Sequence, residues 1–67
     1  MYKNTIREIR KEKGITMEKL AETVGISIGY LCHLEKGTRT NPSVKIMNKM
    51  AKALGKPVSE IFFIDEN

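Results

Sequence analysis

A single glycine in the middle of the chain, Gly25, most constrains how this sequence can fold. The apolar residues of 17–24 have the spacing of a buried helical stripe, and a glycine after them can adopt the left-handed conformation that ends a helix. Two residues later, Ser27 can accept the hydrogen bond that begins the next helix. The spacing therefore predicts two short helices joined by one tight turn, with the second helix held at a steep angle to the first.

The remaining segments also have the pattern of short helices. Apolar residues at helical spacing predict helices over about residues 4–13, 17–24, 27–36, 44–54 and 58–62. No segment shows strand-like alternation or an internal repeat, and residues 63–67 receive no assignment. Five short helices with brief connections predict an all-α fold in one domain spanning residues 1–67. In the fourth helix, the expected buried stripe consists of Val44, Met47, Met50, Ala51 and Leu54.

The size and composition of the chain exclude several classes of protein. A single cysteine, Cys32, cannot form an intrachain disulfide, and no cluster of histidine and cysteine offers a metal site, so we expect no metal and no cofactor. With a lone histidine, His33, and no nucleophile paired with a base, we expect that the chain is not an enzyme. The longest apolar run, 61–64, is too short to cross a bilayer, and the polar start is unlike a secretion signal, which predicts a cytoplasmic protein.

Positive charge is distributed unevenly along the chain. Of the eight acidic residues, three follow the last lysine, and the net charge of the whole chain is +4. Between Lys36 and Lys56 every charged residue is basic. This pattern favours a polyanion as the partner, although a lysine face that only contacts solvent is the alternative on charge alone. The helix predicted at 27–36 is held at a steep angle to the helix before it, and its outer face can enter the major groove of duplex DNA. The helix arrangement and the positive charge therefore point to the same ligand.

Six short motifs follow one another along the chain. They are Gly14-Ile15-Thr16, Leu20-Ala21, Val24-Gly25-Ile26-Ser27, Leu34-Glu35-Lys36-Gly37, Pro42-Ser43 and Ala51-Lys52-Ala53-Leu54-Gly55. In this order and spacing they closely resemble the Cro and phage-repressor-like (XRE-type) helix-turn-helix family. The resemblance covers about residues 3–62, with the helix-turn-helix at about 16–37. It implies a compact five-helix lambda-repressor-like domain and a transcriptional regulator, usually a repressor, that binds operator DNA as a dimer.

In this arrangement the third helix is the recognition helix, and its first residues face the floor of the groove. The residues expected at the bases are Ser27, Ile28, Gly29, Tyr30 and His33. Phosphate contacts are expected at the start of the second helix, near the end of the third helix and in the loop that follows it, together with Tyr30. These residues are Thr16, Lys36, Arg39, Thr40 and Asn41.

Two positions in this set leave alternatives open. Met17, at the start of the second helix, is also one of the expected DNA-binding residues. Relatives commonly carry glutamine at this position, and methionine cannot make the same hydrogen bonds, so recognition relies on shape and few contacts or Met17 faces a protein partner. Gly29 costs helix stability, which indicates either a close approach of the backbone to the duplex or a tolerated change.

Outside this set, Cys32 also leaves two interpretations open. It is most simply an inert helix residue, with a redox switch as the alternative.

Two further pairs of residues are expected to act in structure and assembly. Arg10 and Glu35 occupy the positions that resemble the family's ion pair between the first and third helices, the alternative being two unrelated surface charges. Phe62 is expected to pack on the core. Phe63 and Ile64 are then apolar residues without cover in a small monomer, so we expect them at a dimer interface.

The main rival to an operator-binding regulator is a protein-interaction module. An antitoxin, or a scaffold for a protein partner with weak DNA binding, would explain Met17, Ile28 and Gly29 on the recognition surface. The basic loop and the acid-free segment after Lys36 argue against it, because a pure protein adaptor does not need them. Duplex DNA is therefore the expected partner, and a protein partner is the second possibility.

Overall fold

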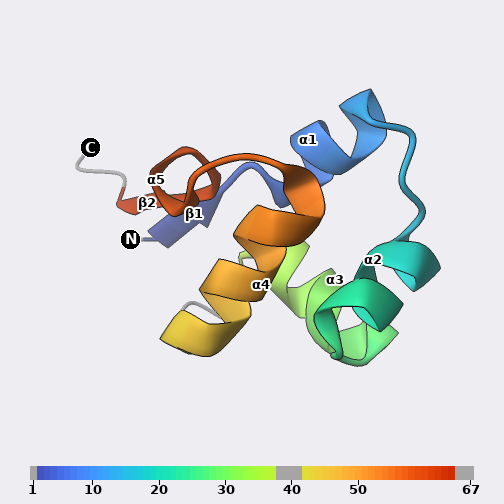
Figure 1. Cartoon of the computed structure of the whole chain (residues 1–67). Coiled ribbons are helices and arrows are strands. Elements are labelled where there is room, and N and C mark those ends of the chain that lie inside the picture. Colours follow the sequence, from blue (N-terminus) through green and yellow to red (C-terminus); the bar gives the residue numbers. More distant parts are fainter. Residues whose placement is uncertain (1, 38–41, 65–67) are drawn as a thin grey trace.

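A computed structural model of the protein describes residues 2–37 and 42–64 (Figure 1). The described chain contains five helices and two short strands. The predicted set of five short helices is therefore confirmed, and each helix begins and ends close to the expected residue. In chain order the elements are β1 (Tyr2–Asn4), α1 (Ile6–Glu12), α2 (Met17–Val24), α3 (Ile28–Lys36), α4 (Val44–Leu54), α5 (Val58–Ile61) and β2 (Phe62–Ile64).

One apolar core joins all five helices. Burial of the apolar side chains in this core makes the main contribution to the stability of so small a domain. Ile15, Ile26, Tyr30 and Phe62 are partly buried and pack against the core, so the expected packing of Phe62 is confirmed. The fully or largely buried members are Ile6, Ile9, Leu20, Ala21, Val24, Leu31, Leu34, Met50, Leu54 and Ile61.

Two residues of the expected stripe on α4, Val44 and Met47, lie outside the core, and Met47 is half-buried. Val44 is 68% exposed, whereas Met50 and Leu54 are fully buried. Val44 is on the same side of the helix as Ala51, which packs against the core, but it lies almost two turns nearer the start of the helix. The sequence pattern included Val44 because it is apolar, but its position on the first turn directs it to solvent.

Three helices begin with a hydroxyl cap, and the cap that the sequence predicts at Ser27 is one of them. The side chain of Thr16 accepts a hydrogen bond from the amide of Lys19 at the start of α2. Ser27 and Ser43 accept equivalent bonds from the amides of Tyr30 and Ile46, at 3.0 and 3.1 Å. Each cap satisfies an amide that the helix itself leaves without an acceptor. These caps fix where α2, α3 and α4 begin.

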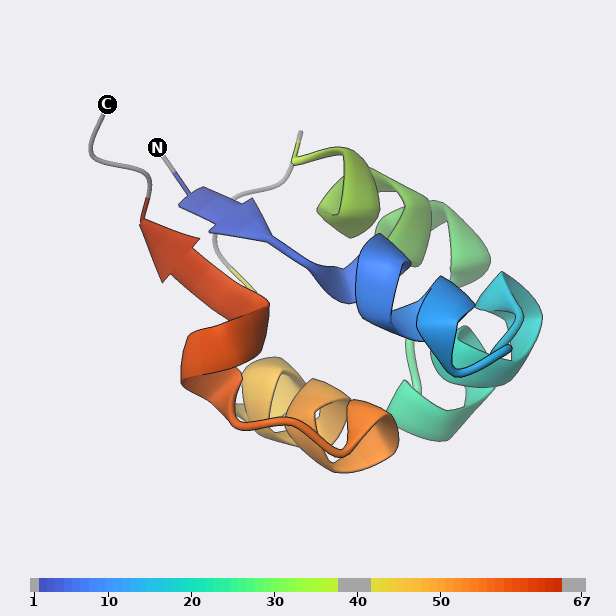
Figure 2. The ribbon, with the colours of Figure 1, turned by 90° about the horizontal axis from the view of Figure 1, so that it is seen from above.

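The two strands correct the expectation of a purely helical chain. β1 and β2 form an antiparallel pair in which Tyr2 lies opposite Ile64, Lys3 opposite Phe63 and Asn4 opposite Phe62. Figure 2 shows this pair at one end of the molecule, beside α5. Asn4 and Phe62, which were expected to be helical, therefore belong to strands. Strands of three residues are too short to show a period in the sequence, and the pairing depends on helices that bring the two segments together.

Polar bonds attach the sheet to the helices. The side-chain amide of Asn4 donates to the carbonyl of Leu34 at 2.7 Å, which ties β1 to the end of α3. The backbone amide of Thr5 donates to the carbonyl of Ile61 at 2.9 Å, and its hydroxyl donates to the carbonyl of Glu60 at 2.7 Å. Through these bonds the N-terminal segment connects α3 to α5. No helix in the described part of the chain is long and apolar enough to cross a membrane.

Candidate nucleic-acid interface

The turn between α2 and α3 is built from a left-handed glycine and a partly buried isoleucine. Gly25 has φ +83°, a conformation that residues with a β-carbon rarely adopt. The amides of Gly25 and Ile26 both donate to the carbonyl of Ala21, at 2.8 and 3.0 Å. Ile26 packs against the core, and Ser27 then begins α3. This local geometry is the tight helix-turn-helix connection that the sequence predicts.

The outer face of α3 is the surface that this turn presents. Leu31 and Leu34 anchor the opposite face in the core. At about 100° per residue, the exposed positions of α3 lie within about 140° of one face. Ile28 is 48% exposed at the first position of the helix. The exposed residues of this face are Ile28, Gly29, His33 and Lys36, preceded by the exposed cap residue Ser27.

Tyr30 and Gly29 are placed differently from one another on this helix. Tyr30 is half-buried and packs against the core, so much of its ring is committed within the fold. A β-carbon at Gly29 would have no atom within 4 Å. Packing inside the protein therefore does not require glycine at position 29.

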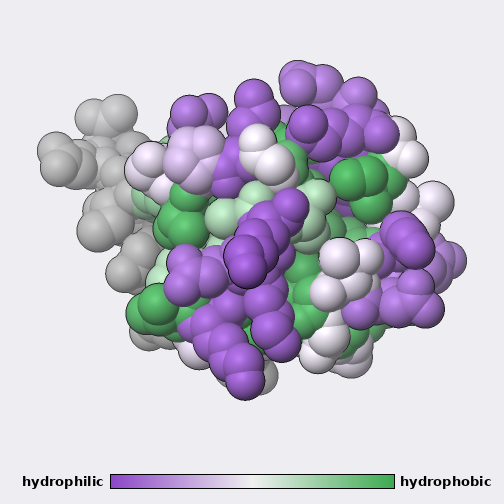
Figure 3. Space-filling view, viewed as in Figure 1, coloured by the Kyte–Doolittle hydropathy of each residue, from purple (hydrophilic) through white to green (hydrophobic). Residues whose placement is uncertain are grey.

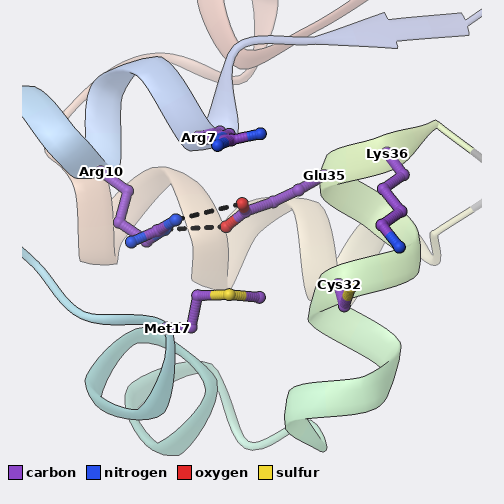
Figure 4. Close-up of a pocket in the computed structure, with 6 residues that line it drawn as sticks. All are labelled: Arg7, Arg10, Met17, Cys32, Glu35 and Lys36. Atoms are coloured by element: carbon purple, nitrogen blue, oxygen red, sulfur yellow. Dashed lines mark hydrogen bonds and ion pairs between the residues drawn. The ribbon is translucent and has the colours of Figure 1, made fainter.

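Thr16 and Met17 stand at the start of α2, next to α3. Thr16 is exposed and its side chain caps the helix. Met17 is half-buried and packs against the core. Its side chain lines a cavity between α1, α2 and α3, together with Cys32 (Figure 4). The structure thus places Met17 in a hollow of the surface, not on the open face of α3.

The expected ion pair between Arg10 and Glu35 is present and largely buried. Arg10 Nε donates to Glu35 Oε2 at 2.8 Å, and Nη2 donates to Oε1 at 3.2 Å, so the contact is bidentate (Figure 4). The exposed fractions of the two side chains are 11% and 6%. Arg10 Nη1 also donates to the carbonyl of Ile15 at 3.0 Å, a partner that sequence reasoning missed. One guanidinium therefore joins α1, the α1–α2 connection and α3.

The other predicted site residues lie in three places. Lys36, the last residue of α3, is exposed. Arg39, Thr40 and Asn41 lie outside the described residues. Phe63 and Ile64 belong to β2, and Phe63 is 39% exposed.

Exposed lysines gather on α4. Lys45, Lys49 and Lys52 are exposed on this helix, and Figure 3 shows hydrophilic side chains over it. They give this part of the surface a positive potential that attracts polyanions. Cys32 is a free, half-buried thiol, and residues 2–37 and 42–64 contain no group of three side chains that could hold a metal ion.

The fold and this face together define a helix-turn-helix domain of the type that binds duplex DNA. The helix-turn-helix family model matches residues 6–61. The chain belongs to this family, in its XRE-type branch, whose named members are transcriptional regulators. The sequence-based prediction of a DNA-binding transcriptional regulator is therefore confirmed at the level of the family, which is one of regulators and not typically of enzymes.

Several known proteins resemble the chain along most of its length. An uncharacterized HTH-type transcriptional regulator of Methanothermobacter thermautotrophicus is 46% identical over 63 residues, which cover 92% of this chain and 90% of that protein. The structure of ClgR, the clp gene regulator of Corynebacterium glutamicum, matches with a TM-score of 0.76 and 36% identity, covering 82% of this chain and 57% of that chain.

A second solved structure includes DNA. SinR, the master regulator for biofilm formation, in complex with DNA matches with a TM-score of 0.73 and 38% identity, covering 79% of this chain and 84% of that chain. SinR of Bacillus subtilis is a named HTH-type transcriptional regulator, and its structure in a complex with the SinI protein also matches.

Proposed function

We propose that this chain is a dimeric repressor that binds a specific operator sequence in duplex DNA with α3 in the major groove. The observation that carries the proposal is the division of α3 into two faces. Leu31 and Leu34 are fixed in the core, while Ser27, Ile28 and His33 are exposed on the other side. A helix held in this way can enter a groove as a rigid unit.

Three side chains of α3 and its cap supply the proposed base contacts. The hydroxyl of Ser27 and the imidazole of His33 can hydrogen-bond to base edges, and Ile28 provides apolar contact for a thymine methyl group. The open space around Gly29 fits a close approach of the backbone to the duplex. Because this face has no Arg, Asn or Gln for bidentate base contacts, shape and deformability of the duplex supply much of the specificity.

Phosphate contacts position this helix. We assign them to Thr16, Tyr30, Lys36 and the loop residues 39–41, with support from the exposed position of Thr16 at the start of α2. Phe63 and Ile64 on β2 form the proposed two-fold contact, which would place two recognition helices about 34 Å apart, one turn of DNA.

Because the proposed ligand is DNA, we assign the protein to the cytoplasm. We assign it no catalytic activity, because Cys32 and His33 are consecutive residues of α3, so their side chains diverge by about 100° and do not form a nucleophile–base pair.

A protein partner is the second candidate function. Ile28 places a large apolar side chain, 48% exposed, at the start of the recognition helix. SinR, which shares this fold, is known in complexes with DNA and with a protein. A partner that covers Ile28 would bind at the same face as DNA, so the two ligands would compete.

Selection of bound duplexes from a random pool tests the proposal, followed by salt titration of the selected sequence. We expect an enriched inverted repeat with half-sites one DNA turn apart, and a log–log salt slope of about −0.9 for each neutralised phosphate. Binding without an enriched sequence would contradict operator recognition. Failure to bind any duplex at low salt would instead favour the protein partner.

A further inference from the structure

A cavity of about 280 Å³ opens between α1, the start of α2 and the last turns of α3. Figure 4 shows its six lining residues: Arg7 and Arg10 from α1, Met17 from α2, and Cys32, Glu35 and Lys36 from α3. Met17 and Cys32 are half-buried and uncharged, whereas Arg7 and Lys36 are exposed. The cavity therefore has a neutral sulfur-containing wall and a cationic rim.

The charges within this cavity do not cancel. Both carboxylate oxygens of Glu35 accept hydrogen bonds from Arg10, so this acid and this base neutralise one another. Neither Arg7 nor Lys36 forms an ion pair with a residue in the described ranges. The two remaining positive charges come from different helices and lie on either side of Glu35 (Figure 4). A cavity with this balance attracts an anion.

The cavity also adjoins the surface assigned to DNA. Cys32 and Lys36 flank His33 on α3, and Met17 follows the cap residue Thr16 at the start of α2. The first amides of α2 have no backbone acceptor within the helix. Of these, the amide of Lys19 donates to the side chain of Thr16. A group that enters the cavity would thus sit between the start of α2 and the end of α3.

We propose that this cavity binds one phosphate group, with Arg7 and Lys36 as the cationic clamp. The ligand chemistry is a phosphate oxygen facing a guanidinium and an ammonium group. Within the proposed function, on which this assignment rests, the phosphate is a phosphodiester of the bound duplex. A free phosphate has the same chemistry and is the other source. Arg7 is a new contact residue, because its position in the sequence gives no sign that α1 reaches the ligand.

Two matched substitutions on α1 test the clamp. Arg7→Gln removes the cation at the cavity, and Lys11→Gln removes an exposed cation of the same helix that does not line it. We expect Arg7→Gln to make the log–log salt slope shallower by about 0.9, with Lys11→Gln unchanged. Equal slopes for the two variants would overturn a contact with DNA at this site. Urea unfolding of both variants shows whether the fold is preserved.

Cys32 serves as a reporter of occupancy, because its thiol lines the same cavity. We would measure its alkylation by iodoacetamide in the wild-type protein with duplex DNA, with inorganic phosphate, and with chloride at equal ionic strength. Slower alkylation with phosphate, lost in Arg7→Gln and kept in Lys11→Gln, would establish a site for free phosphate. Protection by DNA together with the reduced slope of Arg7→Gln would establish the phosphodiester as the ligand.

The outcomes separate this proposal from the function on which it rests. If the wild-type protein binds an operator but Arg7→Gln keeps the full slope and phosphate leaves alkylation unchanged, the cavity assignment is wrong and DNA binding stands. If no duplex binds but phosphate protects Cys32, the cavity takes a free phosphate and the proposed function fails.

Discussion

The Arg10 guanidinium donates three hydrogen bonds inside the fold, two to Glu35 and one to the carbonyl of Ile15. Glu35→Ala would leave the arginine charge largely buried with one remaining acceptor. Removing one partner of a buried pair costs about 3–5 kcal/mol, which is a large part of the stability of a small domain. We expect the midpoint of urea unfolding to fall accordingly.

The pair of Lys19 and Glu22 provides the matched control. Its charged atoms are 3.7 Å apart, and the two side chains are 70% and 78% exposed. Because water and salt screen such a pair, Glu22→Ala should cost less than about 1 kcal/mol. Equal losses for Glu35→Ala and Glu22→Ala would show that the Arg10 contact does not hold α1 to α3.

Single residues differ in how far the sequence predicts their contacts. The Arg10–Glu35 pair could be predicted because both residues occupy motif positions, and it is confirmed. The carbonyl of Ile15 as a third acceptor could not, since a backbone acceptor leaves no trace in residue type. The cavity beside Arg7 could not be predicted either, because three helices must pack before these side chains share one space.

At the scale of the helices, two serine caps allow an effect on stability to be distinguished from an effect on DNA binding. Ser27 caps α3 and Ser43 caps α4, with hydrogen bonds of nearly equal length. Each change to alanine should cost about 1 kcal/mol of stability. Only Ser27→Ala should also weaken operator binding, because Ser27 is the proposed base contact at the start of the recognition helix. Unfolding curves and DNA titrations on both variants check this, and an equal effect on affinity would contradict the role of Ser27.

Two glycines of the helix-turn-helix should respond in opposite directions to alanine. Gly25→Ala places a β-carbon at φ +83° and should destabilise by about 1–2 kcal/mol. Gly29→Ala lies in helical conformation with no atom within 4 Å of the new β-carbon, so it should stabilise by up to about 1 kcal/mol. Thermal melts measure both changes. If Gly29→Ala also binds the operator normally, the proposed close approach to the duplex is wrong.

At the same scale, helices were easier to predict than strands. Caps and terminal glycines are local signals, so α2 and α4 begin and end at the expected residues. β1 and β2 are different, because neither three-residue segment has a pattern of its own. Their pairing joins residues near opposite ends of the sequence and follows from the packing of the helices between them.

The assembly of the whole molecule depends on the exposed side of the small sheet. Asn4 and Phe62 face the body of the protein, through the bond to Leu34 and through the core, and Phe63 alternates to the exposed side. We expect Phe63→Asp to convert a dimer to monomers in sedimentation equilibrium, because burial of a new charge opposes association. Val44→Asp, at another exposed apolar residue, should leave the mass unchanged. A dimer that persists in Phe63→Asp would place the interface elsewhere.

The strand pair also determines how the molecule responds to mechanical force. Tyr2 lies opposite Ile64, so the outer ends of β1 and β2 are at the same end of the sheet. Tension between these ends would open the pair like a zipper, with each hydrogen bond loaded in turn and not all together. The bond from Thr5 to Ile61 would be loaded next. Unfolding by denaturant must disrupt the whole core, whereas separation of the two strands breaks only the few hydrogen bonds of one short pair. A small force is therefore enough to separate the strands.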